Sequence, residues 1–285
     1  MKDIHFVEID TNTIKQYVIS TYEELTGETL ARAHPVRLFL ETLAAIICWL
    51  MANVDYAARA RYFDVVIQKY NPNAKLLLDL ACGTGSLSFE LEQFGYDIVA
   101  VDNSYEMLSV AAEKRGELES SVLFLCQEMS ELDLFGTIDA TVCALDSINH
   151  ILDENELLEV FKKVSLFSNK GAVFVFDVNT IYKHQNILAN NSFVYENEDT
   201  FCVWQNNICD DEVTVDISLD FFDKVPDEKL YARYSTDFSE RAYEIDVLKS
   251  MLLQSGFEVK AVFDDDSFLP IRRDSQRAII VAKKI

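Results

Sequence analysis

The chain has 285 residues, of which 49% are hydrophobic and 12% aromatic, so it can form one large domain or a domain with an appendage. Its 25 basic and 48 acidic residues give a formal net charge of −23. A surface of this sign repels phosphate backbones, and the sequence contains no basic run, so we expect no nucleic-acid substrate.

No segment has the pattern of a signal peptide or of a membrane span. Met1 leads into a mixed polar segment, and the most apolar stretch, Leu38 to Val54, carries Glu41 and is shorter than the ~20 residues that a span needs. The six cysteines occur singly, without the spacing of a zinc site, which is typical of free thiols in a reducing compartment. We therefore predict a cytoplasmic protein with no membrane partner and no metal.

Residues 1–50 predict a helical N-terminal extension, distinct from a domain at 51–285. Thr11 to Leu25 and Ala33 to Met51 show helical periodicity, and a turn around Gly27 separates them. The second segment is apolar nearly all round, so it must be covered by the rest of the chain or by a partner. A homo-oligomer formed through these helices would provide such a cover.

The extension also contains three phrases, Phe6–Asp10, Tyr22–Gly27 and Pro35–Leu40, that resemble the N-terminus of phage baseplate J-like proteins. They cover under a fifth of the chain and carry no catalytic motif. A fused module and an ordinary helical lid both remain open for these residues.

The stretch Leu76 to Ser86 reads Leu-Leu-Leu-Asp-Leu-Ala-Cys-Gly-Thr-Gly-Ser. Its apolar start predicts a short parallel strand buried on both faces, and the two glycines predict a tight turn against which a ligand can lie. A helical pattern follows from Leu87 to Phe94, and a second strand, Asp97 to Val101, ends at Asp102. Such a turn between strand and helix binds nucleotide-like ligands in doubly wound sheets, and Asp102 is placed to accept hydrogen bonds from ribose hydroxyls.

Two ligand families compete for this turn. A dinucleotide fingerprint has Gly or Ala where Ser88 stands and needs no acid such as Asp79 inside the strand, which disfavours a nicotinamide-dependent oxidoreductase. The string from Leu78 to Ser86 closely resembles the first motif of the class I S-adenosylmethionine-dependent methyltransferases. The resemblance covers about residues 50–285 and implies a doubly wound, Rossmann-like α/β fold with a seven-stranded, mostly parallel sheet. It implies S-adenosylmethionine as cofactor and S-adenosylhomocysteine as product.

The resemblance also implies a set of cofactor-binding residues. An arginine on the helix over the methionine end can reach the cofactor carboxylate, although a solvated helix charge is the alternative for it. An acid and an apolar residue close over adenine, with Glu where relatives typically have Asp. The full set is Arg59, Asp79, Ala81, Gly83, Gly85, Asp102, Asn103, Met107, Glu128, Met129 and Leu145. Cys48-Trp49 stands where relatives carry a Tyr-Asp pair, so a non-catalytic S-adenosylmethionine-binding module is the alternative function.

The remaining pattern completes this fold. About residues 185–240 alternate with period two, which predicts an antiparallel insertion on the substrate side, and Asp264 to Asp266 is interpreted as a solvated loop. Further helices are predicted at Ser104–Lys114, Glu156–Leu166 and Glu244–Gly256, and further strands of the main sheet at Val122–Leu125, Ile138–Leu145, Ala172–Asp177, Glu258–Phe263 and Ala278–Ala282. The last two strands would form the reversed hairpin that closes the sheet.

The loop Asp146 to His150 follows the fourth strand, at the edge where ligands bind. His150 is the titratable group near this crevice whose pKa suits a general base, and we predict it as the catalytic residue. Capping of the next helix or contact with the cofactor are the alternatives for it. The loop is similar to that of dTDP-aminosugar N,N-dimethyltransferases and, more loosely, of glycine N-methyltransferases. The predicted function is methyl transfer to a small-molecule amine or hydroxyl acceptor.

Overall fold

The structure, a computed structural model, describes residues 54–224 and 230–285. The helices predicted at 11–25 and 33–51, the phrases similar to phage baseplate proteins and any oligomer contact through them lie outside the described residues. The helix that the resemblance implies over the methionine end, residues 50–62, lies within the described part only from residue 54 on. It is α3 (Tyr56–Tyr70), and its N-cap Asp55 accepts a hydrogen bond from the Ala58 amide at 2.8 Å.

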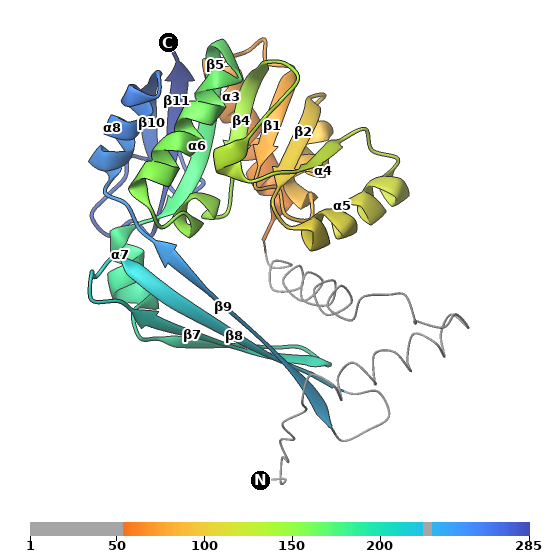
Figure 1. Cartoon of the computed structure of the whole chain (residues 1–285), viewed down its shortest axis with the longest axis vertical. Coiled ribbons are helices and arrows are strands. Elements are labelled where there is room, and N and C mark those ends of the chain that lie inside the picture. The colour runs from red at the N-terminus through yellow and green to blue at the C-terminus, as the bar shows by residue number, and fades with distance from the viewer. Residues whose placement is uncertain (1–53, 225–229) are drawn as a thin grey trace.

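A seven-stranded sheet forms the centre of the described chain (Figure 1). Neighbouring strands are parallel except β11, which runs antiparallel to both β5 and β10. This order confirms the doubly wound, mostly parallel sheet with a reversed hairpin at one edge. In sheet order the strands are β10 (Phe257–Asp264), β11 (Arg277–Lys284), β5 (Ser168–Asn179), β4 (Ile138–Cys143), β1 (Leu76–Leu80), β2 (Asp97–Asp102) and β3 (Leu123–Cys126).

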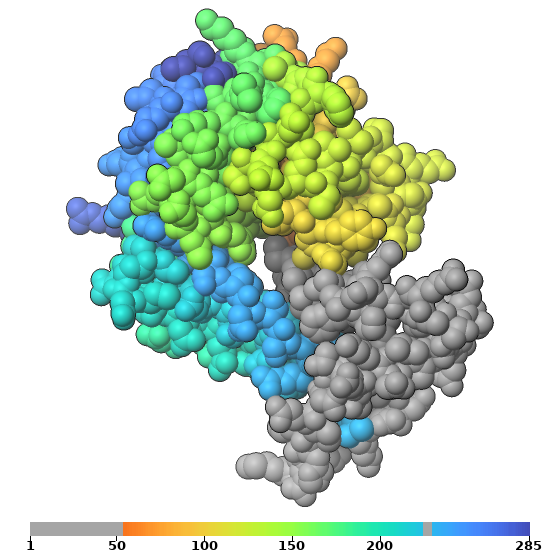
Figure 2. All heavy atoms as spheres, in the orientation of Figure 1, coloured from red at the N-terminus to blue at the C-terminus, as the bar shows by residue number. Residues whose placement is uncertain are grey.

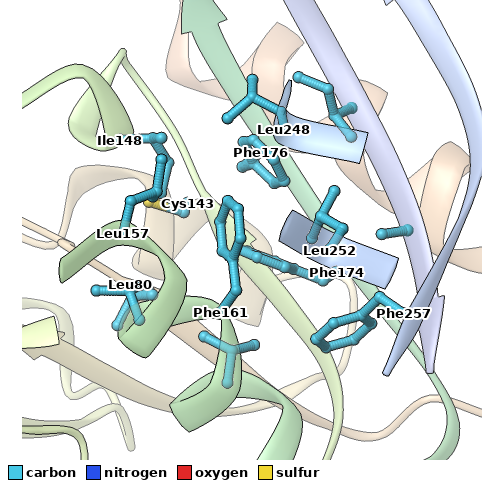
Figure 3. Packing of buried hydrophobic residues seen from close by; sticks show 14 of the residues in the cluster. Leu80, Cys143, Ile148, Leu157, Phe161, Phe174, Phe176, Leu248, Leu252 and Phe257 are labelled. Atoms are coloured by element: carbon cyan, nitrogen blue, oxygen red, sulfur yellow. The ribbon is translucent and has the colours of Figure 1, made fainter. Parts of the chain in front are cut away.

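Helices cover both faces of this sheet because alternate strand residues point to opposite sides. Leu77 belongs to the hydrophobic cluster that includes α3 and α4, whereas Leu78 and Leu80 belong to the cluster that includes α6 and α8. On the second face the rings of Phe174 and Phe161 lie 5.9 Å apart (Figure 3). The other helices are α4 (Ser86–Glu92), α5 (Tyr105–Leu118), α6 (Glu154–Leu166) and α8 (Ile245–Gln254).

A second sheet of four antiparallel strands lies between β5 and α8 in the chain. Figures 1 and 2 show it as a lobe below the carboxyl edge of the large sheet. Every second residue from Val215 to Phe221 on β8, one of its two inner strands, is buried. One face of this sheet therefore carries a small hydrophobic core of its own. This confirms the predicted antiparallel insertion. Its elements are α7 (Ile181–Lys183), the π-helix η4 (His184–Leu188), β6 (Ser192–Glu196), β7 (Thr200–Ile208), β8 (Thr214–Lys224) and β9 (Tyr231–Arg241).

The next three observations concern only the described residues, 54–224 and 230–285. The five cysteines in this part of the chain are free thiols. None of its helices is long and apolar enough to cross a membrane. No group of three or more His, Cys, Asp and Glu side chains within it is arranged to hold a metal ion.

Candidate functional site

The candidate site lies at the point where the order of the strands in the sheet changes direction. β1 and β4 are neighbours, but β2 and β3 follow on one side of them and β5 on the other, and ligands bind at the carboxyl ends of the strands at such a point. Ala81 follows β1 and Leu145 follows β4, and both have a φ of 61°. Left-handed backbone costs a non-glycine residue about 1–2 kcal/mol and gathers at functional sites. The structure thus places both predicted residues at one strained edge.

The two glycines of the first turn differ in what surrounds them. Gly83 has a φ of +54°, and a Cβ added there would have no atom within 4 Å. Gly85 has a φ of +72°, and an added Cβ would lie 2.8 Å from the Phe124 ring and 3.2 Å from the Phe89 ring. Gly85 therefore permits close packing of the turn on the core, whereas the side of Gly83 that lacks a Cβ faces open space.

Asp79 lies beneath this turn instead of facing the open crevice. The residue is 1% exposed, and its carboxylate accepts a hydrogen bond of 2.5 Å from the hydroxyl of Ser88, which is fully buried. Burial raises the pKa of Asp79 to about 7, although the Ser88 hydrogen bond opposes that rise. Asp79 and Ser88, the two residues that differ from a dinucleotide fingerprint, therefore form one buried hydrogen-bonded pair under the glycine turn.

This pair gives a prediction about stability. The pKa of Asp79 in the folded protein lies above its usual 3.8, so its contribution to stability is complete below that value and is lost as the pH rises through about 7. We expect Asp79→Asn, which can still accept from Ser88, to raise the free energy of unfolding at pH 8 by about 2–4 kcal/mol, at ~1.4 kcal/mol per unit of pKa. Urea unfolding at pH 8 and pH 5 measures this, and the gain should shrink at pH 5. Equal stabilities of the two proteins at pH 8 would refute it.

Asp102 connects the turn to the end of β2. One carboxylate oxygen accepts from the Gly83 amide at 2.7 Å, and the other accepts from the Ser104 amide at 2.9 Å. Burial raises the pKa of Asp102, while these amide donors oppose the rise. The Ser104 hydroxyl in turn accepts from the Met107 amide and caps α5. Hydrogen bonds through Ser104 therefore connect Asp102 to Met107 at one corner of the turn.

Beside this corner the protein surface is hollowed. The hollow measures about 370 Å³ and is lined by Asn103, Cys126, Gln127, Glu128 and Glu131. Asn103 donates from its side-chain amide to the Glu128 carboxylate at 3.2 Å, so two residues of the predicted cofactor set lie together here. Met129, the apolar residue predicted to close over adenine with Glu128, packs against the core cluster under α6 and does not line the hollow.

Arg59 is buried, so its interpretation as a solvated helix charge is wrong. Its residue surface is 8% exposed, and its guanidinium lies 3.2 Å from Asp266 and 3.7 Å from Asp177. The sequence suggested that Asp264 to Asp266 form a solvated loop, and this is wrong for Asp266, because it pairs with Arg59. Within the described residues, the Nη1 atom of Arg59 is buried without a hydrogen-bond partner, and it lies 3.7 Å from the Asp177 carboxylate.

A charged network that the predicted set lacked lies at the ends of β4 and β5. Arg277, at the start of β11, bonds to the Asp177 carboxylate and donates to Asp146 at 2.8 Å. Asp177 also accepts from the Leu145 amide at 2.6 Å, which holds the strained residue in place. Burial opposes ionisation of Asp146, but Arg277 and Lys183 hold its pKa at about 2. The signal in the sequence was the presence of polar residues directly after two buried strands.

His150 ends the 3₁₀ helix η3 (Ser147–His150), at the same edge of the sheet. Its side chain is 47% exposed, and its ring lies 5.2 Å from that of Phe238 on the insertion. Partial burial lowers the pKa of His150, which Asp146 and Asp102 oppose. It does not cap the next helix, because Asp153 accepts the first amides of α6. His150 is therefore an accessible imidazole between the large sheet and the insertion.

Comparison with known proteins gives three main similarities. Residues 77–171 match the family described as methyltransferase domain. A protein of Geobacillus sp. (strain WCH70) that is named as a methyltransferase is 30% identical over 82% of this chain and 95% of its own length. The crystal structure of a S-adenosylmethionine-dependent methyltransferase from Clostridium acetobutylicum ATCC 824 is 32% identical, with a TM-score of 0.76 over 82% of this chain and 94% of that chain.

A more limited similarity is to a protein whose name states the compounds that it methylates. A glycine/sarcosine N-methyltransferase from Halorhodospira halochloris is 31% identical over 129 residues. These residues are 44% of this chain and 48% of that protein. The similarity therefore includes less than half of either chain.

Proposed function

This chain belongs to the S-adenosylmethionine-dependent methyltransferases, and from that premise we propose that it methylates the nitrogen of a small-molecule amine. The observation that carries the proposal is the position of His150, a half-exposed imidazole at the carboxyl edge of the sheet whose pKa is lowered. An amine must be unprotonated to attack, and an unprotonated imidazole can accept its proton. The partial similarity to a glycine/sarcosine N-methyltransferase supports an amine as the acceptor.

The residues at the edge of β1 and β2 fit the cofactor. A ligand that lies against the backbone needs open space beside the turn, and Gly83 provides it. An amino-acid end with a carboxylate needs a donor, and within the described residues the buried Arg59 Nη1 makes an ion-pair contact with Asp177 at 3.7 Å but no hydrogen bond. In our assignment Asp102 holds the ribose hydroxyls, and Asn103 and Glu128 face adenine in the hollow. Asp79, Ala81, Gly85, Met107, Met129 and Leu145 then shape or support the backbone around these contacts.

The chemistry needs little machinery from the protein. The bound cofactor supplies an electrophilic methyl group on a sulfonium. The crevice residues align the acceptor nitrogen with that methyl group, and such alignment can lower the barrier by about 7–11 kcal/mol in favourable cases. His150 then holds the proton that leaves the acceptor nitrogen.

The glycine turn gives a prediction with a matched control. We expect Gly83→Ala to weaken S-adenosylhomocysteine binding by about tenfold or more, because a methyl group that overpacks a filled site costs ~1–3 kcal/mol. Gly95→Ala is the control, since Gly95 also has a positive φ, +88°, and open space around it, but it lies in the turn after α4. Calorimetry should show reduced affinity for the first variant and unchanged affinity for the second. Equal affinities in both variants would place the cofactor elsewhere.

Matched acceptors test the proposed function directly. Glycine, sarcosine and aminosugars are incubated with the protein and S-adenosylmethionine beside analogues in which a hydroxyl replaces the amine. Release of S-adenosylhomocysteine should depend on the amine and be absent with the hydroxyl analogues. Turnover with the hydroxyl compounds alone would assign an oxygen acceptor instead.

A further inference from the structure

Glu240 is a buried carboxyl group between two histidines. It lies near the end of β9 and is 3% exposed. One carboxylate oxygen lies 3.8 Å from His150 Nε2, and the other lies 3.8 Å from His184 Nε2. The insertion thus brings a carboxyl group to the inner side of the imidazole that we assign as the base.

His184 has one ring nitrogen that makes no hydrogen bond within the described residues. Its Nδ1 lies 2.7 Å from the Val213 carbonyl oxygen, and because a carbonyl can only accept, Nδ1 carries the proton. Its Nε2 then presents a lone pair, and within the described residues this atom is buried without a hydrogen bond. The residue is fully buried, so a proton on Glu240 is the available donor for that lone pair.

The surroundings of Glu240 favour a proton on it. The Asn179 amide donates at 3.0 Å to Glu240 and at 3.0 Å to Asp146, so it holds the two carboxyl groups together. Burial raises the pKa of Glu240 to about 8, and the nearby charge of Asp146 adds to the rise. A neutral Glu240 is therefore favoured at neutral pH, and its carboxyl oxygen lies 3.8 Å from His184 Nε2, the atom that carries the lone pair.

Asn149 joins the loop that carries His150 to the two strands beside it. It is fully buried, and its amide group donates to the Asn179 and Arg241 carbonyls at 3.1 and 2.9 Å. Its side-chain oxygen also accepts from the backbone amide of Asn179 at 2.8 Å. The residue before His150 is thus bonded to the end of β5 and to the end of β9, the strand that carries Glu240.

We propose that Glu240 and His184 are a positioning pair for His150, which carries one shared proton and supplies a carboxylate when His150 takes up the acceptor's proton. This inference rests on the proposed function. As the new carbon–nitrogen bond forms and the carbon–sulfur bond breaks, the acceptor nitrogen gives its proton to the His150 imidazole. The shared proton shifts from the Glu240 oxygen to His184 Nε2, so a carboxylate faces the new imidazolium and no proton is gained or lost by the pair.

Other charged groups also face these three side chains. Asp146 lies on the loop after β4, Lys183 on α7, Asp102 at the end of β2 and Asp211 on the turn before β8. Asp146 is already paired with Arg277, and Lys183 donates to Asn179 at 2.8 Å. Glu240 differs from them because its proton can move without leaving the cluster.

The test is a titration of His150 in the full chain by NMR, with its signal assigned by its loss in His150→Ala. Glu240→Gln can still accept from Asn179 and donate to His184, but it cannot become a carboxylate. His184→Asn keeps a donor for Val213 and removes Nε2. We expect each variant to lower the pKa of His150 by about one pH unit, the lower end of the effect of a nearby opposite charge. The double variant should show no larger shift.

Kinetics add a second readout. At neutral pH, Glu240→Gln should lower kcat about tenfold, one unit of pKa being about tenfold in an equilibrium, and should have no further effect in a His150→Ala background. Glu258→Gln on β10, which pairs with Lys260 at 2.6 Å, is the charge control and should change neither measurement.

An unchanged His150 titration in Glu240→Gln would overturn the inference. So would an equal loss of kcat with and without His150, because it would show a merely structural role. The titration needs no acceptor, so a failure of every amine to react would refute the proposed function and still leave the pair to be judged by NMR.

Discussion

Replacing His150 with alanine is expected to lower the turnover number by about 10²–10⁴, the usual loss when a general base is removed. The affinity for S-adenosylhomocysteine should stay nearly unchanged, because the proposed cofactor contacts lie at the ends of β1 and β2. The imidazole is half exposed at the other side of the crevice, beside Phe238 and Glu240. Steady-state kinetics with a saturating amine, together with calorimetry, separates the two effects.

The pH profile of this reaction follows from the same residue. Partial burial lowers the pKa of His150 from its usual 6.5, so the imidazole is unprotonated at neutral pH and the rate should fall only as the pH drops below the lowered pKa. The acidic limb should disappear in His150→Ala. If His150 only orients the acceptor, His150→Asn should retain much of the rate and the acidic limb should persist. Unchanged turnover in His150→Ala would remove this residue from methyl transfer.

Asp102→Ala should weaken S-adenosylhomocysteine binding by about 1–3 kcal/mol, the cost of losing a hydrogen bond to a charged group. The substitution also frees the Gly83 amide, which now donates to Asp102 at 2.7 Å, so the turn loses its connection to β2. Asp97→Ala is the control, since Asp97 is exposed at the opposite end of β2. Calorimetry should show the loss for Asp102→Ala alone, and equal affinities of the two variants would exclude Asp102 from the site.

The parts of the site that depend on local pattern could be predicted from the sequence. A buried strand followed by Gly-Thr-Gly fixes a turn, and the acid after the next strand must lie beside it because parallel strands end at one edge. The structure accordingly bonds Asp102 to the Gly83 amide. Alternation of period two predicts the antiparallel insertion and continuous apolar runs predict the buried strands, whereas the doubly wound order of the large sheet is implied by the resemblance to the methyltransferases.

The parts that depend on distant residues could not be predicted. Arg59 is buried because Asp266, from the loop between β10 and β11, lies 3.2 Å from its guanidinium. Glu240 reaches Asn179 across a separation of 61 residues, and no local pattern marks Glu240. The different surroundings of Gly83 and Gly85 arise from the Phe124 ring on β3. Such contacts follow from tertiary packing, which a single sequence does not display.

A crystal structure of the complex with S-adenosylhomocysteine tests the central claim most directly. Adenine should lie in the hollow beside Asn103 and Glu128, and the ribose hydroxyls should lie at Asp102. The homocysteine carboxylate should meet Arg59, and the sulfur should face the His150 side of the crevice. A ligand bound away from the ends of β1 and β2, or one whose sulfur points away from His150, would contradict the account.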